Sequence, residues 1–204
     1  MEIDTIIKNL KEMLVLRGDN IDEFEEHEVD INRDDFYNNK ELIEFNTDNT
    51  TLIFALSKIL KSLVIDNLTE NENNIDNIFN KFNKKNNIIL IFNNESLSST
   101  IVSKLNKFDR IYQKSKGGMI QYFQINQLLF NPTKHILVPE HRKLSPTEVN
   151  ELMEKYLIKN KLQMPIIMHN DVIAKWIGLK QGDIVEIKRY NENSGLSYYY
   201  RYCI

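Results

Sequence analysis

HILVPEHRKLSPTEVNELMEKYLIKNKLQMP, residues 135–165, contains the clearest structural signals in this chain. Its segment Ser145-Pro146-Thr147-Glu148 has the pattern of a capping box with proline at the first helical position, which predicts a helix start. Apolar residues then recur at helical spacing and predict one buried face, made of Val149, Leu152, Met153, Tyr156 and Leu157. The stretch therefore predicts a capped helix that packs on a core.

The residues that follow predict a second, shorter helix and a β-hairpin. In NDVIAKWIGLKQGDIVEIKRY, residues 170–190, Asp171 can cap a helix that carries Val172, Ile173, Trp176 and Ile177, and Gly178 can end it. A turn over residues 180–183 leads into a strand, and a second turn over residues 191–195 leads into SYYYRYCI, residues 197–204. Two strands joined by a short loop that contains glycine predict an antiparallel hairpin.

The N-terminal part predicts alternating helices and strands. Ile3, Ile6, Ile7, Leu10, Met13 and Leu14 predict a helix that ends near Gly18. We expect a short helix within residues 19–40 and another around Ile75–Phe82, between two asparagine-rich tracts. TTLIFAL, residues 50–56, favours a strand, and a helix that runs on through SKILKSL is the alternative.

The next part of the chain reads as strand, helix, strand. IILIF, residues 88–92, is typical of a strand buried on both faces. LSSTIVSKLNKF, residues 97–108, favours a helix, and Gly117-Gly118 favours a turn into a strand over MIQYF, residues 119–123. This order predicts an α/β layer with a right-handed crossover.

Two domains are expected, with their boundary at Asn131-Pro132, where proline restrains the preceding residue. The fold class is α/β, or α+β overall. An α/β domain spans residues 1–130, and a small α+β domain with the antiparallel hairpin spans residues 131–204.

Composition excludes several functional classes. A net charge of -3 argues against a strongly electrostatic nucleic-acid binder, so any DNA contact is expected to be local or shared with partners. The single cysteine, Cys203, excludes an internal disulfide and fits a reducing compartment. The N-terminus has neither a signal-peptide pattern nor a membrane span, which predicts an intracellular, soluble protein. No GxxxxGK or GxGxxG occurs, so nucleotide binding has no support.

Three groups of residues suggest chemistry, and each has a simpler structural explanation. Asp171, Glu186 and Lys188 have the form of a stand-alone magnesium-dependent nuclease centre, although Asp171 also serves as a helix cap. Lys180, Lys188, Arg189 and Arg201 lie near Tyr198, Tyr199 and Tyr200, which suggests a small nucleic-acid-binding module, and a solvated hairpin face explains them too. His135 and His141 suggest a metal site, but no CxxC or HExxH accompanies them, and a structural or interface role is favoured.

The C-terminal residues resemble a known family. The matching positions are His135, Leu137, Val138, Pro139, His141, Tyr156, Met164-Pro165, the run Asp171 to Gly182, Arg189, Glu192, Gly195, Tyr200 and Arg201. This pattern resembles the fifth-largest subunit shared by eukaryotic nuclear RNA polymerases, whose C-terminal half corresponds to a small subunit of the archaeal RNA polymerases. Three departures are Val172 for a proline, Ile166 for an arginine, and Asn191 and Asn193 for a serine and a threonine.

The resemblance implies a non-catalytic subunit of a DNA-directed RNA polymerase, with no cofactor, no metal and no membrane contact. Residues 131–204 would form an assembly domain that docks on the largest subunit and the polymerase core. Residues 1–130 would form a jaw-like domain beside the downstream double-stranded DNA, which it touches indirectly or weakly. The location implied is the nucleus for a cellular protein, and the host cytoplasm or virion for a viral one. Candidate contacts are Val138, Pro139, Glu140, His141, Gly178, Lys180, Gly182, Glu192, Gly195 and Arg201.

Overall fold

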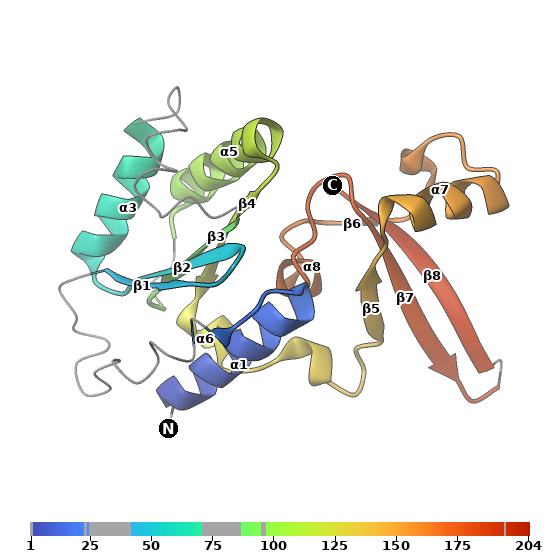
Figure 1. Cartoon of the computed structure of the whole chain (residues 1–204), viewed down its shortest axis with the longest axis horizontal. Coiled ribbons are helices and arrows are strands. Elements are labelled where there is room, and N and C mark those ends of the chain that lie inside the picture. Colours follow the sequence, from blue (N-terminus) through green and yellow to red (C-terminus); the bar gives the residue numbers. More distant parts are fainter. Residues whose placement is uncertain (1, 23, 25–41, 71–86, 95–96, 194) are drawn as a thin grey trace. The chain divides into compact units, whose positions relative to one another are not determined.

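A computed structural model describes residues 2–22, 24, 42–70, 87–94, 97–193 and 195–204 (Figure 1). Contacts between Cα atoms divide the chain into two compact units, Met1–Phe130 and Asn131–Ile204. At the division, the Asn131 side chain accepts a hydrogen bond from the backbone N–H of Thr133 and caps a short 3-10 helix, η2 (Pro132–Lys134). The predicted α+β class is confirmed.

The first unit is built on a four-stranded sheet with the order β1-β2-β3-β4. The strands are β1 (Ile43–Asn46), β2 (Thr50–Ala55), β3 (Asn87–Phe92) and β4 (Met119–Gln124). β2, β3 and β4 are parallel, and β1 pairs antiparallel to β2. Every residue of β2 is buried and so are five of the six in β3, because both strands lie in the middle of the sheet with both faces covered.

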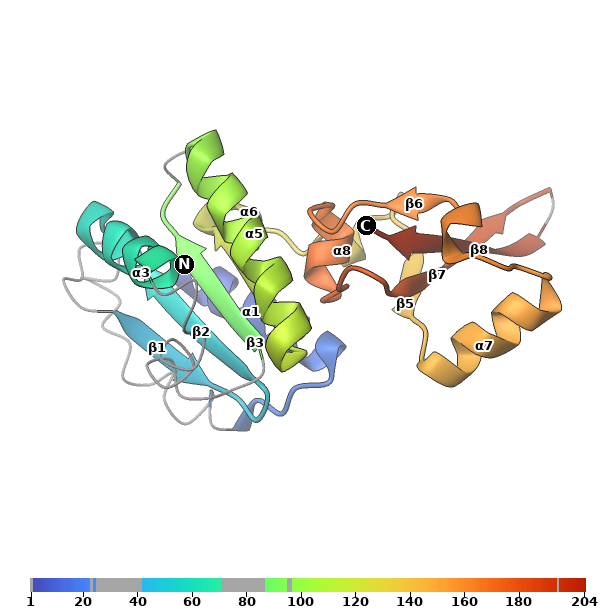
Figure 2. The ribbon, with the colours of Figure 1, turned by 90° about the horizontal axis from the view of Figure 1, so that it is seen from above.

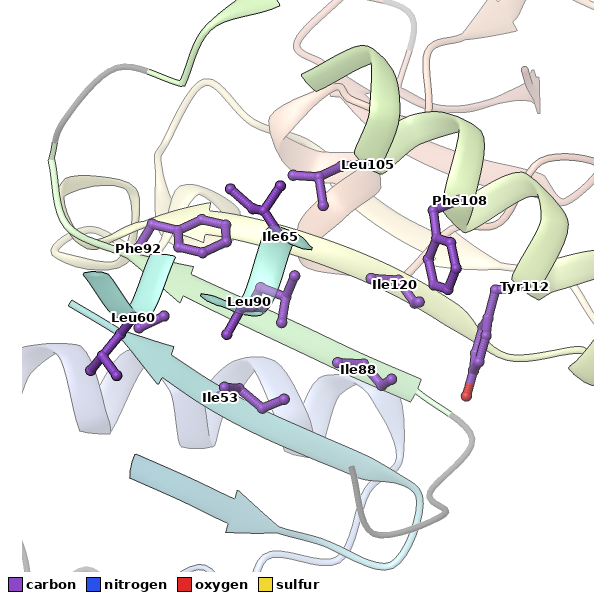
Figure 3. Close-up of a cluster of buried hydrophobic side chains, with 12 residues drawn as sticks. Ile53, Leu60, Ile65, Ile88, Leu90, Phe92, Leu105, Phe108, Tyr112 and Ile120 are labelled. Carbon is purple, nitrogen blue, oxygen red and sulfur yellow. The ribbon is translucent and has the colours of Figure 1, made fainter. Parts of the chain in front are cut away.

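Helices α3 (Lys58–Glu70) and α5 (Ser99–Lys116) cover one face of this sheet (Figures 1 and 2). Phe108 and Tyr112 of α5 lie beside Ile120 and Ile88 of the sheet, and Leu105 lies near Ile65 of α3, as Figure 3 shows. Helices α1 (Glu2–Arg17) and α6 (Ile125–Leu128) lie on the opposite side of the sheet. The Asn9 amide of α1 donates a hydrogen bond of 2.7 Å to the carbonyl oxygen of Leu128, which joins these two helices.

Most of the predicted elements in this unit are confirmed. α1 ends at Arg17, and Gly18 follows with a φ of 85°, a left-handed conformation that glycine adopts readily. Residues 50–55 are a strand, and the alternative helix begins only at Lys58. β1 was not predicted. The helix expected around Ile75–Phe82, and nearly all of the segment in which a short helix was expected after Gly18, lie outside the described residues.

The second unit has a four-stranded sheet with the order β5-β7-β8-β6. Its elements are η2, β5 (Glu140–Lys143), α7 (Pro146–Lys155), η3 (Lys161–Gln163), β6 (Ile166–Ile167), α8 (Val172–Trp176), β7 (Ile184–Asn191) and β8 (Gly195–Cys203). β7 and β8 form the predicted antiparallel hairpin. β5 pairs antiparallel to β7, and β6 pairs parallel to the end of β8.

The two faces of this sheet are covered by different helices. On the face that we call the α7 face, Ile184 packs with Val149 and Leu152 of α7. On the other face, the α8 face, Val185 and Ile187 pack with Ala174, Ile177 and the buried Cys203. Because side chains alternate along a strand, Glu186 and Lys188 belong to the α7 face and Arg189 to the α8 face.

The capping residues were predicted correctly, but one helical face was not. Ser145 and Glu148 form the capping box of α7, and Asp171 caps α8. Tyr156 and Leu157 are 53% and 86% exposed, so the prediction that they extend the buried face of α7 is wrong. The reason is that α7 ends at Lys155 and Leu157 has a φ of 53°, which turns the chain away from the core.

Candidate partner and DNA interfaces

The segment before β5 presents two apolar side chains to solvent. The carbonyl oxygen of His135 accepts a hydrogen bond of 2.8 Å from the N–H of Val138, which closes a four-residue turn. The His135 ring nitrogen Nδ1 accepts a second bond, of 3.2 Å, from the N–H of Leu137. Ile136 and Leu137, the two central residues, are 95% and 82% exposed. We call this feature the apolar turn tip, residues 136–137.

The candidate contacts Val138, Pro139, Glu140 and His141 follow this tip directly. Val138, Pro139 and His141 are half-buried, and Glu140 is exposed. The Glu140 carboxylate lies 3.7 Å from the Lys188 ammonium group on the α7 face. His141 lies on the α8 face, because its partner in the register is Ile187.

His141 belongs to a group of polar side chains on the α8 face that we call the polar cluster: His141, Asp171, Arg189, Tyr199 and Arg201. Burial lowers the pKa of His141; the Pro139 carbonyl and Asp171 oppose this shift, and Arg201 and Arg189 add to it. The imidazole is therefore neutral at pH 7. Its Nδ1 lies 2.7 Å from the Pro139 carbonyl oxygen, which can only accept, so Nδ1 carries the proton.

Arg189 and Tyr199 are stacked within the polar cluster. The guanidinium carbon of Arg189 lies 4.5 Å from the centre of the Tyr199 ring, a cation–π distance. Arg201 is opposite Val185 in the register and half-exposed. With the imidazole neutral, two guanidinium groups and one carboxylate give the polar cluster a net positive charge.

The glycines among the candidate contacts have backbone roles. Gly178 ends α8 with a φ of 67°, and Gly182 has a φ of 100°. The N–H of Gly182 donates to the carbonyl oxygen of Cys203 at 2.9 Å, and the N–H of Lys180 donates to the Asp183 carboxylate at 2.7 Å. This turn therefore joins α8 and β7 to the end of β8. Of the candidate contacts in the turn, Lys180 offers a half-exposed side chain.

Glu192 and Gly195 lie at the tip of the hairpin. Gly195 has a φ of 70°, and Glu192 is exposed. These two residues are well separated along the strands from His141 and Arg201. The candidate contacts thus lie in four places: Val138 to Glu140 at the start of β5, the α8–β7 turn, the polar cluster with His141 and Arg201, and the hairpin tip.

The nuclease hypothesis is wrong in its geometry. Glu186 and Lys188 share the α7 face, as predicted, but Asp171 caps α8 on the other face of the sheet. The Glu186 carboxylate accepts bonds from the Arg142 guanidinium at 3.0 and 3.3 Å and from the Tyr200 hydroxyl at 3.1 Å. No cluster of three or more metal-binding side chains occurs in the described ranges of the chain.

The basic and aromatic residues of the hairpin are also divided between the two faces of the sheet. Tyr198 and Tyr200 pair with Lys188 and Glu186 on the α7 face, whereas Tyr199 lies on the α8 face, so three successive tyrosines do face both ways. Burial and the nearby Glu186 carboxylate raise the pKa of Tyr200 to about 12, which keeps its hydroxyl protonated as the donor. The residues do not form one nucleic-acid-binding patch.

A basic surface in the first unit was not predicted from the sequence. Lys104, Lys107, Arg110 and Lys114 are exposed on α5, at spacings that place them along one side of the helix. The helix has a single carboxylate, Asp109, which is buried on the opposite side. We call these four residues the basic face of α5. The signal was present in the spacing, but the net charge of the chain, -3, hides it.

Comparison with known proteins identifies the C-terminal unit. A family model described as RNA polymerase Rpb5, C-terminal domain, matches residues 130–203. The DNA-directed RNA polymerase subunit Rpo5 of Pyrococcus horikoshii is 51% identical over 72 residues, which are 35% of this chain and 87% of that protein. The chain belongs to the Rpb5 family of RNA polymerase subunits.

Two further Rpb5-family relatives show how far the similarity extends. Rpo5 of Thermococcus kodakarensis is 47% identical over 72 residues, 35% of this chain and 87% of that protein. The shared subunit rpabc1 of RNA polymerases I, II and III of Dictyostelium discoideum is 37% identical over 93 residues, 46% of this chain and 47% of that protein. Since residues 131–204 number 74, an alignment of 93 residues must reach into the first unit.

The departures from the Rpb5-family pattern lie at exposed positions. Ile166 in β6 and Val172 in α8 are 50% and 54% exposed. The Asn191 side chain accepts a hydrogen bond of 3.0 Å from the N–H of Asn193, a turn-stabilising contact that a serine hydroxyl also makes. No helix in the described part of the chain is long and apolar enough to cross a membrane.

Proposed function

We propose that this chain is a non-catalytic subunit of a multisubunit DNA-directed RNA polymerase. Residues 131–204 dock on the largest subunit and the polymerase core, and residues 1–130 form a jaw-like domain beside the downstream double-stranded DNA. The observation that carries the proposal is the match of residues 130–203 to the Rpb5 C-terminal domain, in a segment that is itself a compact unit. The separation of Asp171 from Glu186 supports a role without catalysis by this chain.

The apolar turn tip supports docking as the role of the second unit. Two adjacent apolar side chains that are almost fully exposed are costly in water and are typical of residues that enter a partner's pocket. Their hydrogen-bonded turn holds them in place before binding, which lowers the entropy cost of association. Val138 to His141, which follow the anchor directly in the chain, would extend this contact, and Lys180, Glu192 and Arg201 would add contacts elsewhere on the unit.

The basic face of α5 supports a contact between the first unit and DNA. Lys104 and Lys114 are ten residues apart, about 15 Å along the helix, which is enough to reach successive phosphates. Four cations without an exposed carboxylate on the same helix provide the local contact that a protein of net charge -3 needs.

A co-purification experiment tests the docking role. The full chain, tagged and expressed in its own organism or host cell, should purify with the large polymerase subunits. Replacing Ile136 and Leu137 with alanine should lower recovery of those subunits by about ten-fold or more, a typical anchor effect. The matched control is Leu157→Ala with Leu162→Ala, which truncates two aliphatic side chains at exposed positions outside the proposed contact region. Recovery of no polymerase subunit by the wild-type chain would refute the proposal.

A charge reversal tests the DNA role. Lys104, Arg110 and Lys114, each changed to glutamate in the assembled polymerase, should weaken binding to DNA with a long downstream duplex and reduce its salt dependence. The control changes Lys8 of α1 and Lys155 and Lys159 of the second unit, all exposed, to glutamate, an equal change in charge. Equal effects of the two sets would assign the result to net charge rather than to α5.

A further inference from the structure

One edge of β8 is open over most of its length. Ile166 and Ile167 of β6 pair with Tyr202 and Cys203 only. From Gly195 to Arg201, this edge has no strand partner among the residues that the structure describes. Its other edge pairs with β7 throughout.

The hydrogen bonds at the end of β8 show which backbone groups face the open edge. The N–H of Tyr202 donates to the carbonyl oxygen of Pro165 at 2.8 Å, on the β6 side. The N–H of Cys203 donates to Asp183 at 2.9 Å, on the β7 side. Backbone groups alternate sides along an antiparallel strand, so Leu196, Tyr198 and Tyr200 direct their N–H and C=O groups outward. An open edge of this kind is a template for another strand.

We propose that the open edge of β8 binds an extended segment of a partner polymerase subunit as an added strand, and that carboxylate side chains alternate with apolar ones along this segment. The inference rests on the proposed docking role and specifies how the region between Glu192 and Arg201 takes part in it. Backbone hydrogen bonds would supply affinity, and the alternating side chains would supply specificity.

The two faces of the sheet determine which side chains of the added strand should be apolar and which should be carboxylates. Beside the open edge on the α7 face lie Leu196, Tyr198 and Tyr200, and the charges behind them are matched, since Lys188 lies near Glu140 and Arg142 binds Glu186. On the α8 face lie Tyr199 and Arg201, with Arg189 stacked on the tyrosine and the net positive charge of the polar cluster. Apolar side chains of the added strand therefore fit the α7 face, and carboxylates fit the α8 face.

A second copy of the chain fits this edge less well. β8 contains Arg201 and no carboxylate, and Arg189 of the neighbouring strand lies with Arg201 on the α8 face. Pairing β8 with itself would bring two such pairs of arginines together. Charge complementarity thus favours an acidic partner segment.

A peptide tests the proposal on the full chain. The probe is a blocked seven-residue peptide of alternating glutamate and valine, and the control peptide has lysine in place of glutamate. Amide hydrogen exchange should slow at Leu196, Tyr198 and Tyr200 with the probe, whereas Ser197 and Tyr199, already bonded to β7, should not change. The lysine peptide should bind at least about ten-fold more weakly. Absence of binding, equal binding of the two peptides, or protection without alternation would overturn the proposal.

Two variants distinguish the contribution of the Tyr198 backbone N–H to peptide binding from that of its side chain. Tyr198→Pro removes an outward N–H and leaves the β7 ladder intact, and prolines are tolerated on edge strands. Tyr198→Ala removes the ring and keeps the N–H. We expect the proline variant to bind the glutamate–valine peptide about ten-fold more weakly than the alanine variant. Equal affinities would show that the outward N–H makes no contact with the peptide and would contradict the proposal.

N-methylated peptides give the same test without altering the protein. Methylation of the alternate amides that face β8 should abolish binding, and methylation of the other set should not. Analytical ultracentrifugation of the free chain detects self-pairing. If the chain forms a dimer and Tyr198→Pro dissociates it, the open edge binds a second copy of the chain, and the proposal of an acidic partner segment is wrong. Peptide binding without co-purification of polymerase would refute only the proposed function. Co-purification without peptide binding would refute only this inference.

Discussion

At the scale of single residues, Ser145 and Glu148 determine where α7 begins. The Ser145 hydroxyl accepts a bond of 3.4 Å from the N–H of Glu148, and the Glu148 carboxylate accepts one of 2.8 Å from the N–H of Ser145. The same carboxylate pairs with Arg142 of β5 at 2.7 Å. Two residues thus satisfy two of the free N–H groups at the start of the helix and join it to the sheet.

Removal of the Ser145 hydroxyl should therefore destabilise the second unit. We expect Ser145→Ala to lower its free energy of unfolding by about 1 kcal/mol, the usual effect of losing an N-cap. Urea unfolding, followed by the fluorescence of the buried Trp176, measures this change. Asn150→Ala, at an exposed position of the same helix, should cause no loss. Equal losses in the two variants would contradict the role of the cap.

The Glu148 carboxylate makes stability depend on pH in the acid range. The Ser145 backbone N–H, then Arg142, lower the pKa of Glu148 from its ordinary 4.5 to about 2. Because the folded state lowers this pKa, the stabilisation is present above about pH 4.5 and is lost as the pH falls toward 2. Glu148→Gln should therefore flatten the fall in unfolding free energy between these values, measured by urea titration at each pH. A fall as steep as in the wild type would rule out Glu148 as its source.

At the scale of elements, a buried carboxylate joins α5 to β4. The Asp109 side chain accepts a bond of 2.7 Å from the N–H of Ile120 and another, of 2.9 Å, from the Gln113 amide. Asp109→Ala leaves the buried N–H of Ile120 without this acceptor and should lower the unfolding free energy of the first unit by roughly 1–3 kcal/mol. Asp109→Asn keeps an acceptor and should cost less. Chemical denaturation of both variants gives the comparison, and the reverse order would disprove the assignment.

Elements with strong local signals could be predicted from the sequence, and elements formed by pairing alone could not. IILIF predicted β3 because both faces of that strand are buried, and the Ser145 box predicted α7. β5 consists of Glu140, His141, Arg142 and Lys143, with no apolar alternation, and it is a strand because β7 lies beside it. β6 has two residues, too few to show a period.

The residues of the candidate site could likewise be predicted only where a local sequence pattern indicates them. Asp171, Glu186 and Lys188 suggested a shared centre because sequence spacing does not reveal which face of a sheet a helix covers. The exposure of Ile136 and Leu137 depends on a turn closed by His135, and no local pattern required that turn. The open edge of β8 depends on the shortness of β6, which is known only from the register.

At the scale of the whole molecule, the second unit should fold without the first. The archaeal Rpo5 relatives are matched over 87% of their own length by a segment of 72 residues, so they contain little besides this unit. Residues 131–204 expressed alone should give a dispersed amide NMR spectrum and one cooperative unfolding transition. The control is the full chain, whose second-unit resonances should coincide with those of the fragment. A collapsed, poorly dispersed spectrum would show that the first unit is required.

Cys203 gives this protein a built-in reporter. The thiol is fully buried under α8, and burial, followed by the charge of Asp183, raises its pKa to about 12. Since only the thiolate reacts with alkylating reagents, iodoacetamide should modify the native chain extremely slowly and the denatured chain quickly. The chain has no other cysteine, so a single mass increment assigns every labelled molecule to opening of this region. The rate of labelling would report the local opening equilibrium in any larger assembly, without mutation or added dye.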